Sequence, residues 1–584
     1  MRRPLIAATA AALLAWAPLA PLAQETPAFS RPSQRGLLEY PSIHHPVVGD
    51  AGMVASQNEV ASEVGAAVLR RGGNAVDAAV AIGFALAVTL PRAGNIGGDG
   101  FMVLHMAEAQ RTTAIDYRST APKAARLEMF LNAESKENDA VASAGYRAAA
   151  VPGTVAGLWL AHSKYGKRPW AELVQPAIDL ADKGVALSHD EAFVFSWGRE
   201  RLSASDQARR TFYKLDGGLY RAGEVLRQPE LAWTLRQVAR RGADGFYKGE
   251  VARRFAADMK AHGGLISLED LAAYRAVERA PLVGSYRGLT VYTAPPASAG
   301  GATLINMLNM LEGFDLKSMG LGSAQSLHVM AEAMKLAYVD RYRVLGDTDF
   351  VAIPLRGFTS KAYAAERAKL ISTERARNTA EAMGPGDPSR YESPSTTHYS
   401  VVDAQGNAVS NTYTLGSDFG SGVSVEGTGF LLNNQMNNYA ITEAAAAKAK
   451  GEPAPLNAMA PGKRMLSTMT PTLVFKGAKP WLVTGTPGGS TIIDTVLQLI
   501  VNVVDHGLNV AEAVHQPRIF QGAAPGPLNV EPNFNPDTRA LLEAKGHRVA
   551  PYETMGSAQS IVLENGRVYG ASDPRRPGAT AVAQ

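Results

Sequence analysis

A run of apolar residues from Ala75 to Leu90 constrains the fold of this 584-residue chain more than any other segment. Asn74, just before the run, is a favourable helix N-cap, and Pro91, just after it, cannot continue a helix. The pattern therefore predicts a helix that is apolar on every side, and such a helix must be buried. A second helix is predicted from Ser56 to Arg71, where apolar residues recur at helical spacing until Gly72-Gly73.

Alternating strand patterns surround these helices. We predict strands at Phe101–Met106 and Thr112–Tyr117, and a strand pair near Leu282–Thr293. Most of residues 150–345 has the spacing of amphipathic helices, whereas short strands and glycine turns follow from Thr396 onward. A strand-rich centre with helical flanks predicts a layered α/β fold rather than a helix bundle.

The composition excludes several classes of function. Hydrophobic residues make up 46% and charged residues 19% of the chain, values typical of a globular protein with a substantial core. A net charge of +4 without any sustained Lys/Arg block argues against nucleic-acid binding. The absence of cysteine excludes disulfides, thiolate metal sites and a cysteine nucleophile. The 11 histidines are scattered, with no H-x-x-x-H pair on a helix, so we expect no metal.

The first 23 residues have the features of a cleaved export signal. Met1-Arg2-Arg3 is basic, Leu5–Trp16 is apolar, and Ala20–Ala23 contains the small residues expected before a signal-peptide cleavage site. The apolar stretch is short for a bilayer span, although an uncleaved anchor remains the alternative. We therefore expect a signal peptide at residues 1–23, a periplasmic or secreted protein, and no membrane attachment after signal removal.

A Ser/Thr-rich joint at Glu392–Thr397 directly precedes one of the alternating strand patterns. Cleavage of the Ser395–Thr396 bond would place Thr396 at a new N-terminus, at the start of that strand. A terminal threonine carries a nucleophilic hydroxyl and an α-amine whose pKa, about 7.7–8.0, suits a general base near neutral pH. Seen alone, such a joint is more often a plain loop. We expect His398 to be a packed strand histidine rather than the base.

Two glycine-rich runs and one arginine are the remaining candidates for functional residues. The run Gly94–Gly100 follows a helix and precedes a strand, the reverse of the order in a nucleotide-binding loop, so we expect it to serve close packing. Gly488 and Gly489 precede a predicted helix at Ser490–Asp505, and their N–H groups could hold an oxyanion, with a plain tight turn as the alternative. Arg118 ends a predicted strand and could bind a carboxylate, although such an arginine is more often structural.

Taken together, these segments resemble the γ-glutamyltransferase (glutathione hydrolase) family over nearly the whole chain that follows the signal. The resemblance rests on many motifs in the family's order: Gly94–Gly98, Asp116–Arg118, Thr396–Asp403, Thr412–Leu415, Leu431–Met436, Leu466–Met469, Pro487–Ser490 and Ser572–Arg576.

The resemblance implies a four-layer αββα N-terminal-nucleophile hydrolase fold, made as a single precursor. Autocatalytic cleavage at Ser395–Thr396 would give a large subunit of residues 24–395 and a small subunit of residues 396–584, intertwined as one body. Thr396 would then attack the γ-amide of glutathione or another γ-glutamyl compound. Water, or an amino-acid or peptide acceptor, would release the acyl group. The family implies no cofactor.

The resemblance also assigns roles position by position. Thr414 corresponds to the hydroxyl that orients the nucleophile, and Gly488 and Gly489 correspond to the oxyanion hole. The remaining positions correspond to substrate contacts: Arg118, Ser467 and Thr468 at the α-carboxylate, and Gln435, Gly416 and Asn438 around the α-amine.

Three positions depart from the family's pattern. Asn438 stands where an acidic residue is common, Gly416 where asparagine is common, and Thr468 where serine is common. The first two changes remove an anion and an amide from the α-amine pocket, and an ion pair near 4 Å is worth about 4 kcal/mol at an effective dielectric of 20 before desolvation. The pattern thus leaves a glutaryl or cephalosporin-type acylase open as an alternative, unless Asn437 or Glu426 compensates.

Two further expectations concern the class of protein and the segment Ile441–Pro461. The alternative to an enzyme is an exported, non-catalytic relative that binds amino-acid derivatives or a partner. The segment Ile441–Pro461 is rich in Ala, Lys and Pro, so we expect a mobile surface loop. By resemblance it takes the place of a lid over the pocket, but it contains no tyrosine to close by an aromatic contact.

Overall fold

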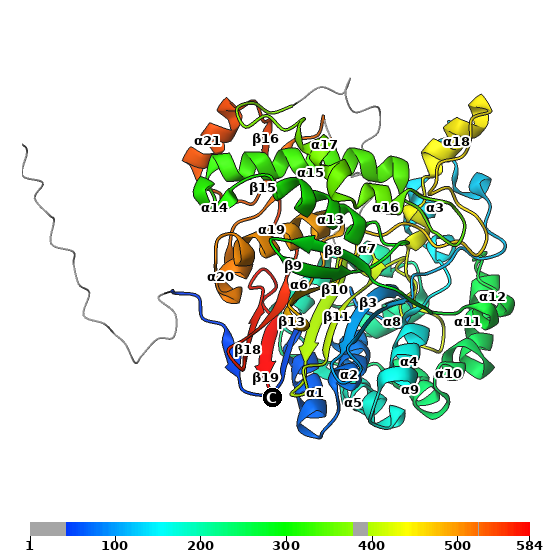
Figure 1. Cartoon of the computed structure of the whole chain (residues 1–584). Coiled ribbons are helices and arrows are strands. Elements are labelled where there is room, and N and C mark those ends of the chain that lie inside the picture. Colours follow the sequence, from blue (N-terminus) through cyan, green and yellow to red (C-terminus); the bar gives the residue numbers. More distant parts are fainter. Residues whose placement is uncertain (1–41, 378–394, 524) are drawn as a thin grey trace, which may run out of the picture. The chain divides into compact units, whose positions relative to one another are not determined.

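Two antiparallel sheets of seven strands each form the centre of the fold, as the computed structural model shows for residues 42–377, 395–523 and 525–584 (Figure 1). The first sheet has the order β1 (Val47–Gly49), β18 (Arg567–Ser572), β17 (Gln559–Glu564), β13 (Lys479–Thr484), β12 (Thr472–Lys476), β9 (Leu289–Thr293) and β8 (Leu282–Tyr286). The second has the order β19 (Thr580–Ala583), β2 (Met53–Ser56), β10 (Ser395–Val402), β11 (Ala408–Gly416), β3 (Asp99–Met106), β4 (Arg111–Asp116) and β7 (Val277–Arg279). The predicted signal peptide and residues 392–394 of the joint lie outside the described residues.

The two sheets pack face to face, and helices cover both outer faces. A buried apolar layer that includes Met53, Val103 and Val402 from the second sheet and Leu473 and Ile561 from the first lies between them. The second sheet is covered by the helices α1 (Glu59–Arg70), α2 (Ala75–Thr89), α4 (Thr154–Tyr165), α5 (Trp170–Lys183) and α9 (Pro229–Arg241). On the side of the first sheet lie the helices α13 (Gly300–Leu311), α15 (Ala324–Val344), α19 (Ile492–Val504) and α20 (Val510–His515). The predicted four-layer αββα fold is therefore confirmed.

Further helices and strands connect these layers. They are the helices α3 (Asp139–Ser143), α6 (His189–Trp197), α7 (Arg199–Leu202), α8 (Asp206–Phe212), α10 (Asp244–Tyr247), α11 (Gly249–Ala261), α12 (Leu268–Ala273), α14 (Leu316–Met319), α16 (Leu355–Phe358), α17 (Lys361–Ala368), α18 (Ile441–Lys450) and α21 (Pro536–Ala544), and the strands β5 (Val185–Ala186), β6 (Val225–Leu226), β14 (Ile519–Gln521), β15 (Leu528–Val530) and β16 (Val549–Pro551). Within the described residues, no helix is both long and apolar enough to cross a bilayer.

The two N-terminal helices form largely as predicted. In α2 the Asn74 side chain accepts a hydrogen bond from the N–H of Asp77, whose carboxylate accepts one from the Asn74 N–H, and every residue of the helix is buried. Helix α1 begins at Glu59 rather than at Ser56, because Ser56 belongs to β2 and Asn58 caps the helix. The strand pairs β3–β4 and β8–β9 confirm the alternating patterns.

The prediction of a surface loop at Ile441–Pro461 is wrong for its first half. Residues Ile441–Lys450 form helix α18, which ends at Gly451 in the left-handed conformation (φ 69°). Alanine and lysine are strong helix formers, and the prolines come only after Gly451, so composition alone was a poor guide here. Residues 452–461 have no regular secondary structure.

The glycine run Gly94–Gly100 packs closely against β11 and against the segment around Leu431. A Cβ atom at Gly98 would lie 2.1 Å from the carbonyl oxygen of Thr414, and one at Gly97 would lie 2.1 Å from that of Leu431. Backbone cannot yield at these distances, so no side chain fits at either position. The interpretation of this run as a packing loop is confirmed.

Gly98→Ala should therefore destabilise the fold and displace Thr414. We expect a loss of at least about 2 kcal/mol in the free energy of unfolding, because overpacking against backbone admits little relaxation. Urea denaturation followed by circular dichroism measures it. Gly357→Ala is the matched control, since a Cβ atom there meets nothing within 4 Å. Equal stability of the two variants would contradict this account of the loop.

Candidate active site

Thr396 lies at the start of β10, at a local irregularity in its pairing with β11. Ser395 pairs with Gly416 and Thr397 pairs with Tyr413, so the single residue Thr396 faces two residues of β11, Thr414 and Leu415. Such a bulge bends the strand and redirects a side chain. Thr396 is 6% exposed. The bulge brings the hydroxyls of Thr396 and Thr414 together.

The two threonine hydroxyls form a short chain of hydrogen bonds. Thr396 Oγ1 donates to Thr414 Oγ1 at 3.2 Å, and the backbone N–H of Gly416 donates to the same Thr414 oxygen at 2.8 Å. The N–H of Gly416 thereby fixes the acceptor that orients the Thr396 hydroxyl.

A cavity of about 40 Å³ opens at the Thr396 hydroxyl. Most of the predicted site residues line it together: Arg118, Thr396, Thr414, Gly416, Gln435, Asn438, Ser467, Thr468 and Gly489. Gly488 does not line this cavity; it lines a neighbouring one of about 730 Å³. The structure thus gathers residues from the segment after β4, from β10 and β11, from the 3-10 turn Gln435–Asn438 and from the loops before β12 and α19.

Arg118 is the one cationic side chain in this cavity within the described part of the chain. Its Nη1 donates to both carboxylate oxygens of Asp99, at 2.8 and 3.1 Å, and its Nη2 and Nε donate to the carbonyls of Leu466 and Met465. Burial raises the pKa of Asp99, against the opposing effect of the Arg118 charge. These four contacts hold the guanidinium rigidly and leave part of its N–H fork for a ligand.

Amide side chains also line the cavity. Gln435 Nε2 donates to Asp99 at 3.3 Å, and Asn438 donates to the Gln435 carbonyl oxygen. Asn457 donates to the Asn438 carbonyl at 2.7 Å and accepts from the N–H of Leu466 at 3.0 Å. Among the described residues, no carboxylate lines the cavity, and the nearest one in this network, Asp99, is paired with Arg118.

The glycine turn after β13 presents two backbone donors. Gly488 (φ 133°) and Gly489 (φ 56°) precede the 3-10 turn that leads into α19. In the described part of the chain, neither N–H donates to a protein acceptor. Thr468 Oγ1 donates to the Gly489 carbonyl at 2.8 Å and fixes the turn. Backbone N–H groups without a protein acceptor, held in a fixed turn, are suited to stabilising a developing oxyanion.

His398 is a structural residue, as predicted. Its ring is fully buried, with Nδ1 2.8 Å from Thr412 Oγ1 and Nε2 3.1 Å from Ser400 Oγ. Burial lowers the pKa of His398 to about 3, so the ring is neutral at physiological pH. Glu426 does not compensate for the missing acid, because it pairs with Arg210 on the surface and does not line the cavity.

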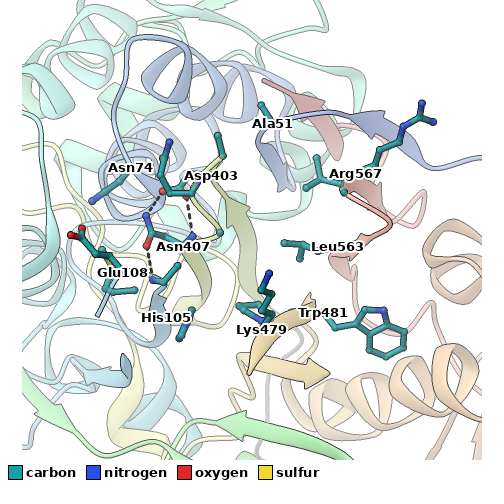
Figure 2. A pocket seen from close by; sticks show the side chains of 18 of the residues that line it. Ala51, Asn74, His105, Glu108, Asp403, Asn407, Lys479, Trp481, Leu563 and Arg567 are labelled. Carbon is teal, nitrogen blue, oxygen red and sulfur yellow. Dashed lines mark hydrogen bonds between the residues drawn. The ribbon is translucent and has the colours of Figure 1, made fainter. Parts of the chain in front are cut away.

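A larger cavity of about 1120 Å³ lies at the other end of β10 (Figure 2). None of the predicted site residues lines it. Its most buried charged residue, Asp403, accepts from the N–H of Ala75 and from Asn407, and so ties α2 to the β10–β11 turn. The hydrogen bonds of Asp403 assign it a structural role.

A family model described as gamma-glutamyltranspeptidase matches residues 61–583 of this sequence. The chain belongs to the γ-glutamyltranspeptidase family. The glutathione hydrolase proenzyme of Escherichia coli (strain K12) is 48% identical over 538 residues, which cover 91% of this chain and 92% of that protein. The suspected family is therefore confirmed.

Acylases are also among the similar members of this family. The Acylase ACY 1 proenzyme of Pseudomonas sp. (strain SE83) is 36% identical, covering 91% of this chain and 94% of that protein. The crystal structure of cephalosporin acylase from Bacillus halodurans superposes with a TM-score of 0.83 at 29% identity, covering 94% of this chain and 98% of that one. Family membership alone thus leaves the preferred acyl group open.

Two cavity residues, Leu466 and Met469, had no role of their own in the sequence interpretation, whereas Asn437 was considered there as a substitute for the missing acid. Leu466 and Met469 flank the predicted Ser467 and Thr468, so their place in a loop that lines the site was a signal that could have identified them. Asn437 donates to Ser143 Oγ at 3.3 Å, which holds its side chain toward α3.

Gly416→Asn, which restores the residue common in the family, should not be tolerated in this chain. Gly416 has φ +100°, and a Cβ atom there would lie 2.1 Å from the Asn434 side-chain oxygen. Strain and overpacking should each destabilise the variant by about 1–3 kcal/mol. Thermal unfolding measures the loss, with Asn438→Asp as the control at the neighbouring departure. A Gly416→Asn variant as stable as the parent would contradict the fixed placement of Asn434.

Proposed function

We propose that this chain hydrolyses and transfers γ-glutamyl groups, from glutathione and other γ-glutamyl amides, through a γ-glutamyl ester on Thr396. One observation carries the proposal: the Thr396 hydroxyl, 3.2 Å from Thr414 Oγ1, opens on a cavity lined also by Arg118 and Gly489. The residues proposed as nucleophile, carboxylate-binding cation and oxyanion donor therefore line one cavity. The activity of the Escherichia coli relative, named a glutathione hydrolase, supports the same assignment.

Maturation would create the catalytic base. The Thr396 hydroxyl attacks the carbonyl carbon of Ser395, the peptide bond becomes an ester, and water hydrolyses it to a Ser395 carboxylate and a free Thr396 α-amine. Residues 24–395 and 396–584 are the proposed subunits. Each seven-stranded sheet contains strands from both sides of this bond. Their hydrogen bonds explain why the two products would remain one folded body.

In the proposed reaction the Thr396 amine accepts the hydroxyl proton while the oxygen attacks the substrate's γ-carbonyl carbon. Gly488 and Gly489 N–H groups would hold the oxyanion that forms. The amine then returns the proton to the leaving nitrogen, and the ester remains on Thr396. Water or an acceptor amine repeats these steps in reverse order, so proton and acyl group balance without a cofactor.

Arg118 and Ser467 are the proposed contacts of the substrate α-carboxylate. Ser467 Oγ accepts from the N–H of Met469 at 3.1 Å, which leaves its own proton free to donate. Thr468, by contrast, already donates its hydroxyl proton to Gly489. Its role is therefore to hold the glycine turn, and its change from the family's serine keeps that function.

The proposed site of action is outside the cytoplasm. Residues 1–23 have the basic, apolar and small-residue regions of an export signal. The choice between periplasm and secretion belongs to the same proposal, as do the small-molecule donors and the amino-acid or peptide acceptors.

A glutaryl or cephalosporin-type acylase is the second candidate, and one observation favours it. No carboxylate among the described residues lines the cavity to pair with a substrate α-ammonium, because Asn438 and Gly416 occupy that part. A substrate whose acyl group lacks the α-amine does not need a carboxylate in this part of the cavity, so its absence does not weaken the binding of that substrate. The acylase names among the similar proteins agree with this candidate.

Purified protein should contain a chain that begins at Thr396. We expect intact-mass spectrometry to show two chains whose masses sum to the precursor plus one water. Thr396→Ala should remain a single chain, whereas Thr396→Ser, which keeps a hydroxyl, should still be cleaved. An intact parent protein would instead favour the non-catalytic binding relative.

The donor preference should depend on Asn438. We expect Asn438→Asp to raise kcat/KM for a γ-glutamyl anilide by about tenfold, because a new carboxylate can pair with the substrate ammonium; tenfold corresponds to about 1.4 kcal/mol. Gln435 must then turn its amide to donate to the new carboxylate. Release of the chromophore measures the rate.

The glutaryl anilide is the matched substrate for this variant. Its kcat/KM should not rise in Asn438→Asp, since it has no ammonium group. A parent enzyme that prefers the γ-glutamyl anilide by about a hundredfold, or about 2.7 kcal/mol, would rule out the acylase candidate. A ratio near one would support it.

A further inference from the structure

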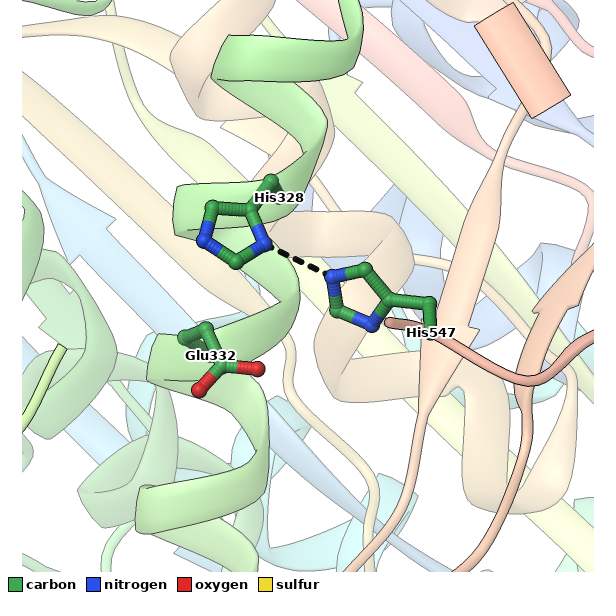
Figure 3. A group of neighbouring side chains, drawn as sticks. All are labelled: His328, Glu332 and His547. Carbon is green, nitrogen blue, oxygen red and sulfur yellow. Dashed lines mark hydrogen bonds between the residues drawn. The ribbon is translucent and has the colours of Figure 1, made fainter. Parts of the chain in front are cut away.

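Two histidines and a glutamate meet in a buried cluster far from the cavity residues in sequence (Figure 3). His328 and Glu332 lie one turn apart on α15, and His547 precedes β16. The three residues are 0%, 2% and 5% exposed. One possible ligand atom of each lies within 4.8 Å of the others. Figure 3 shows the two rings facing each other across their hydrogen bond, with the Glu332 carboxylate beside them on the same helix as His328.

The hydrogen bonds around His328 define which nitrogen has a lone pair. Its Nε2 is 2.7 Å from the Ser372 carbonyl, which can only accept, so Nε2 carries the proton. Nδ1 therefore accepts the bond from His547 Nε2, also at 2.7 Å. His547 Nδ1 is buried without a hydrogen-bond partner in the described part of the chain. A carbonyl that fixes one ring nitrogen is the usual outer support of a metal-binding histidine.

Glu332 retains acceptor capacity on both oxygens. Oε1 accepts from Lys335 Nζ at 2.7 Å, and Oε2 accepts from the Arg377 N–H at 3.1 Å. Each carboxylate oxygen has a second lone pair. Lys335 is 2% exposed and neutralises Glu332 in the absence of a metal ion. The positive charges of Lys335 and Lys545 also act electrostatically on His547. Both lysines therefore repel a bound cation and lower the affinity of the cluster for it.

We propose that His328, Glu332 and His547 form a binding site for one divalent transition-metal ion of the Zn²⁺ type. Two imidazoles and one carboxylate are a typical zinc ligand set. Ligand nitrogens on one tetrahedral zinc lie about 3.3 Å apart, given Zn–N bonds of about 2.05 Å. The two facing nitrogens, now 2.7 Å apart, need to separate by a fraction of an ångström. The proton on His547 Nε2 moves to Nδ1, so both rings stay neutral.

The site would link the two proposed subunits. His328, Glu332 and the supporting Ser372 precede the Ser395–Thr396 bond, whereas His547 follows it, 219 residues beyond His328. A metal there would join the two chains in a protein that has no cysteine for a disulfide. This linking role rests on the proposed cleavage; the binding of the metal does not.

Cobalt(II) titration of the purified, chelator-treated protein tests the site. We expect one Co²⁺ per chain with a visible absorption band that Zn²⁺ abolishes. His328→Gln and His547→Gln should each weaken Co²⁺ binding by more than about 100-fold, because even the loss of an outer support costs 10–100-fold. His105→Gln, at a buried histidine bonded to Thr112, is the matched control and should bind normally.

Lys335→Met tests the charge balance. It removes the competing ammonium with little change of length, so we expect Co²⁺ to bind at least about tenfold more tightly and to raise the unfolding temperature of this variant more than that of the parent. Wild-type protein that binds no stoichiometric Co²⁺, or binding that both histidine variants retain, would overturn the proposal, and neither result depends on how the variants fold.

The uncleaved Thr396→Ala chain separates this proposal from the proposed function. It contains all three ligands and should bind Co²⁺ as the parent does. In the cleaved parent, Zn²⁺ should raise the urea concentration at which the two chains separate, and His547→Gln should abolish that rise. Co²⁺ binding without cleavage of the parent would leave the site in place and remove only its linking role.

Discussion

The antiparallel pairing of β10 with β11 is the interaction on which the proposed catalytic arrangement depends. Strand β2 pairs with β10 only from Tyr399 to Val402, so at the Thr396 end β10 is held by β11 alone. Strand β11 is paired on both sides, because β3 pairs with it from Ala408 to Thr414. At the end of the ladder, the extra residue on β11 places Thr414 Oγ1 against the Thr396 hydroxyl. The glycines at 97 and 98 let the neighbouring loop approach the backbone of this strand pair. If Thr396 is the nucleophile, as proposed, its hydroxyl is already oriented by Thr414 before the preceding bond is cut.

A buried ion pair organises the other side of the site. Asp99 binds Arg118, and Asp99 also accepts from Gln435, so one carboxylate holds both the proposed carboxylate-binding cation and the first of the amides. Removing one partner of a buried pair typically costs about 3–5 kcal/mol because the other charge remains uncompensated. Asp99 follows Gly97 and Gly98 directly in the sequence and thus links this motif to the site.

Local sequence patterns predicted much of this structure, but contacts between segments that are distant in the sequence were harder to predict. The capped apolar helix α2, the paired strands, the packing role of Gly94–Gly100 and the buried His398 follow from residue type and spacing within one segment. The bulge opposite Thr396 could not be predicted from the sequence, because it depends on the register between two strands. Helix α18 was missed because composition was weighed above helix propensity. The His328 cluster escaped a search for H-x-x-x-H spacing, since Glu332 takes the second place and His547 comes from a distant segment.

Substrate preference and packing are coupled in this chain. The family's usual asparagine cannot return at Gly416, because Asn434 fills the space and its side-chain oxygen accepts from the N–H of Ser417 at 2.9 Å. Asn438, in contrast, contacts Gln435 through a side chain that is only partly buried, so an acid there requires a turn of the Gln435 amide, at the cost of its hydrogen bond to Asp99. The two departures therefore differ in kind. One is built into the backbone conformation of β11, and the other is a change of charge that a single substitution can reverse. A shift of specificity in this chain is expected to proceed through Asn438 first.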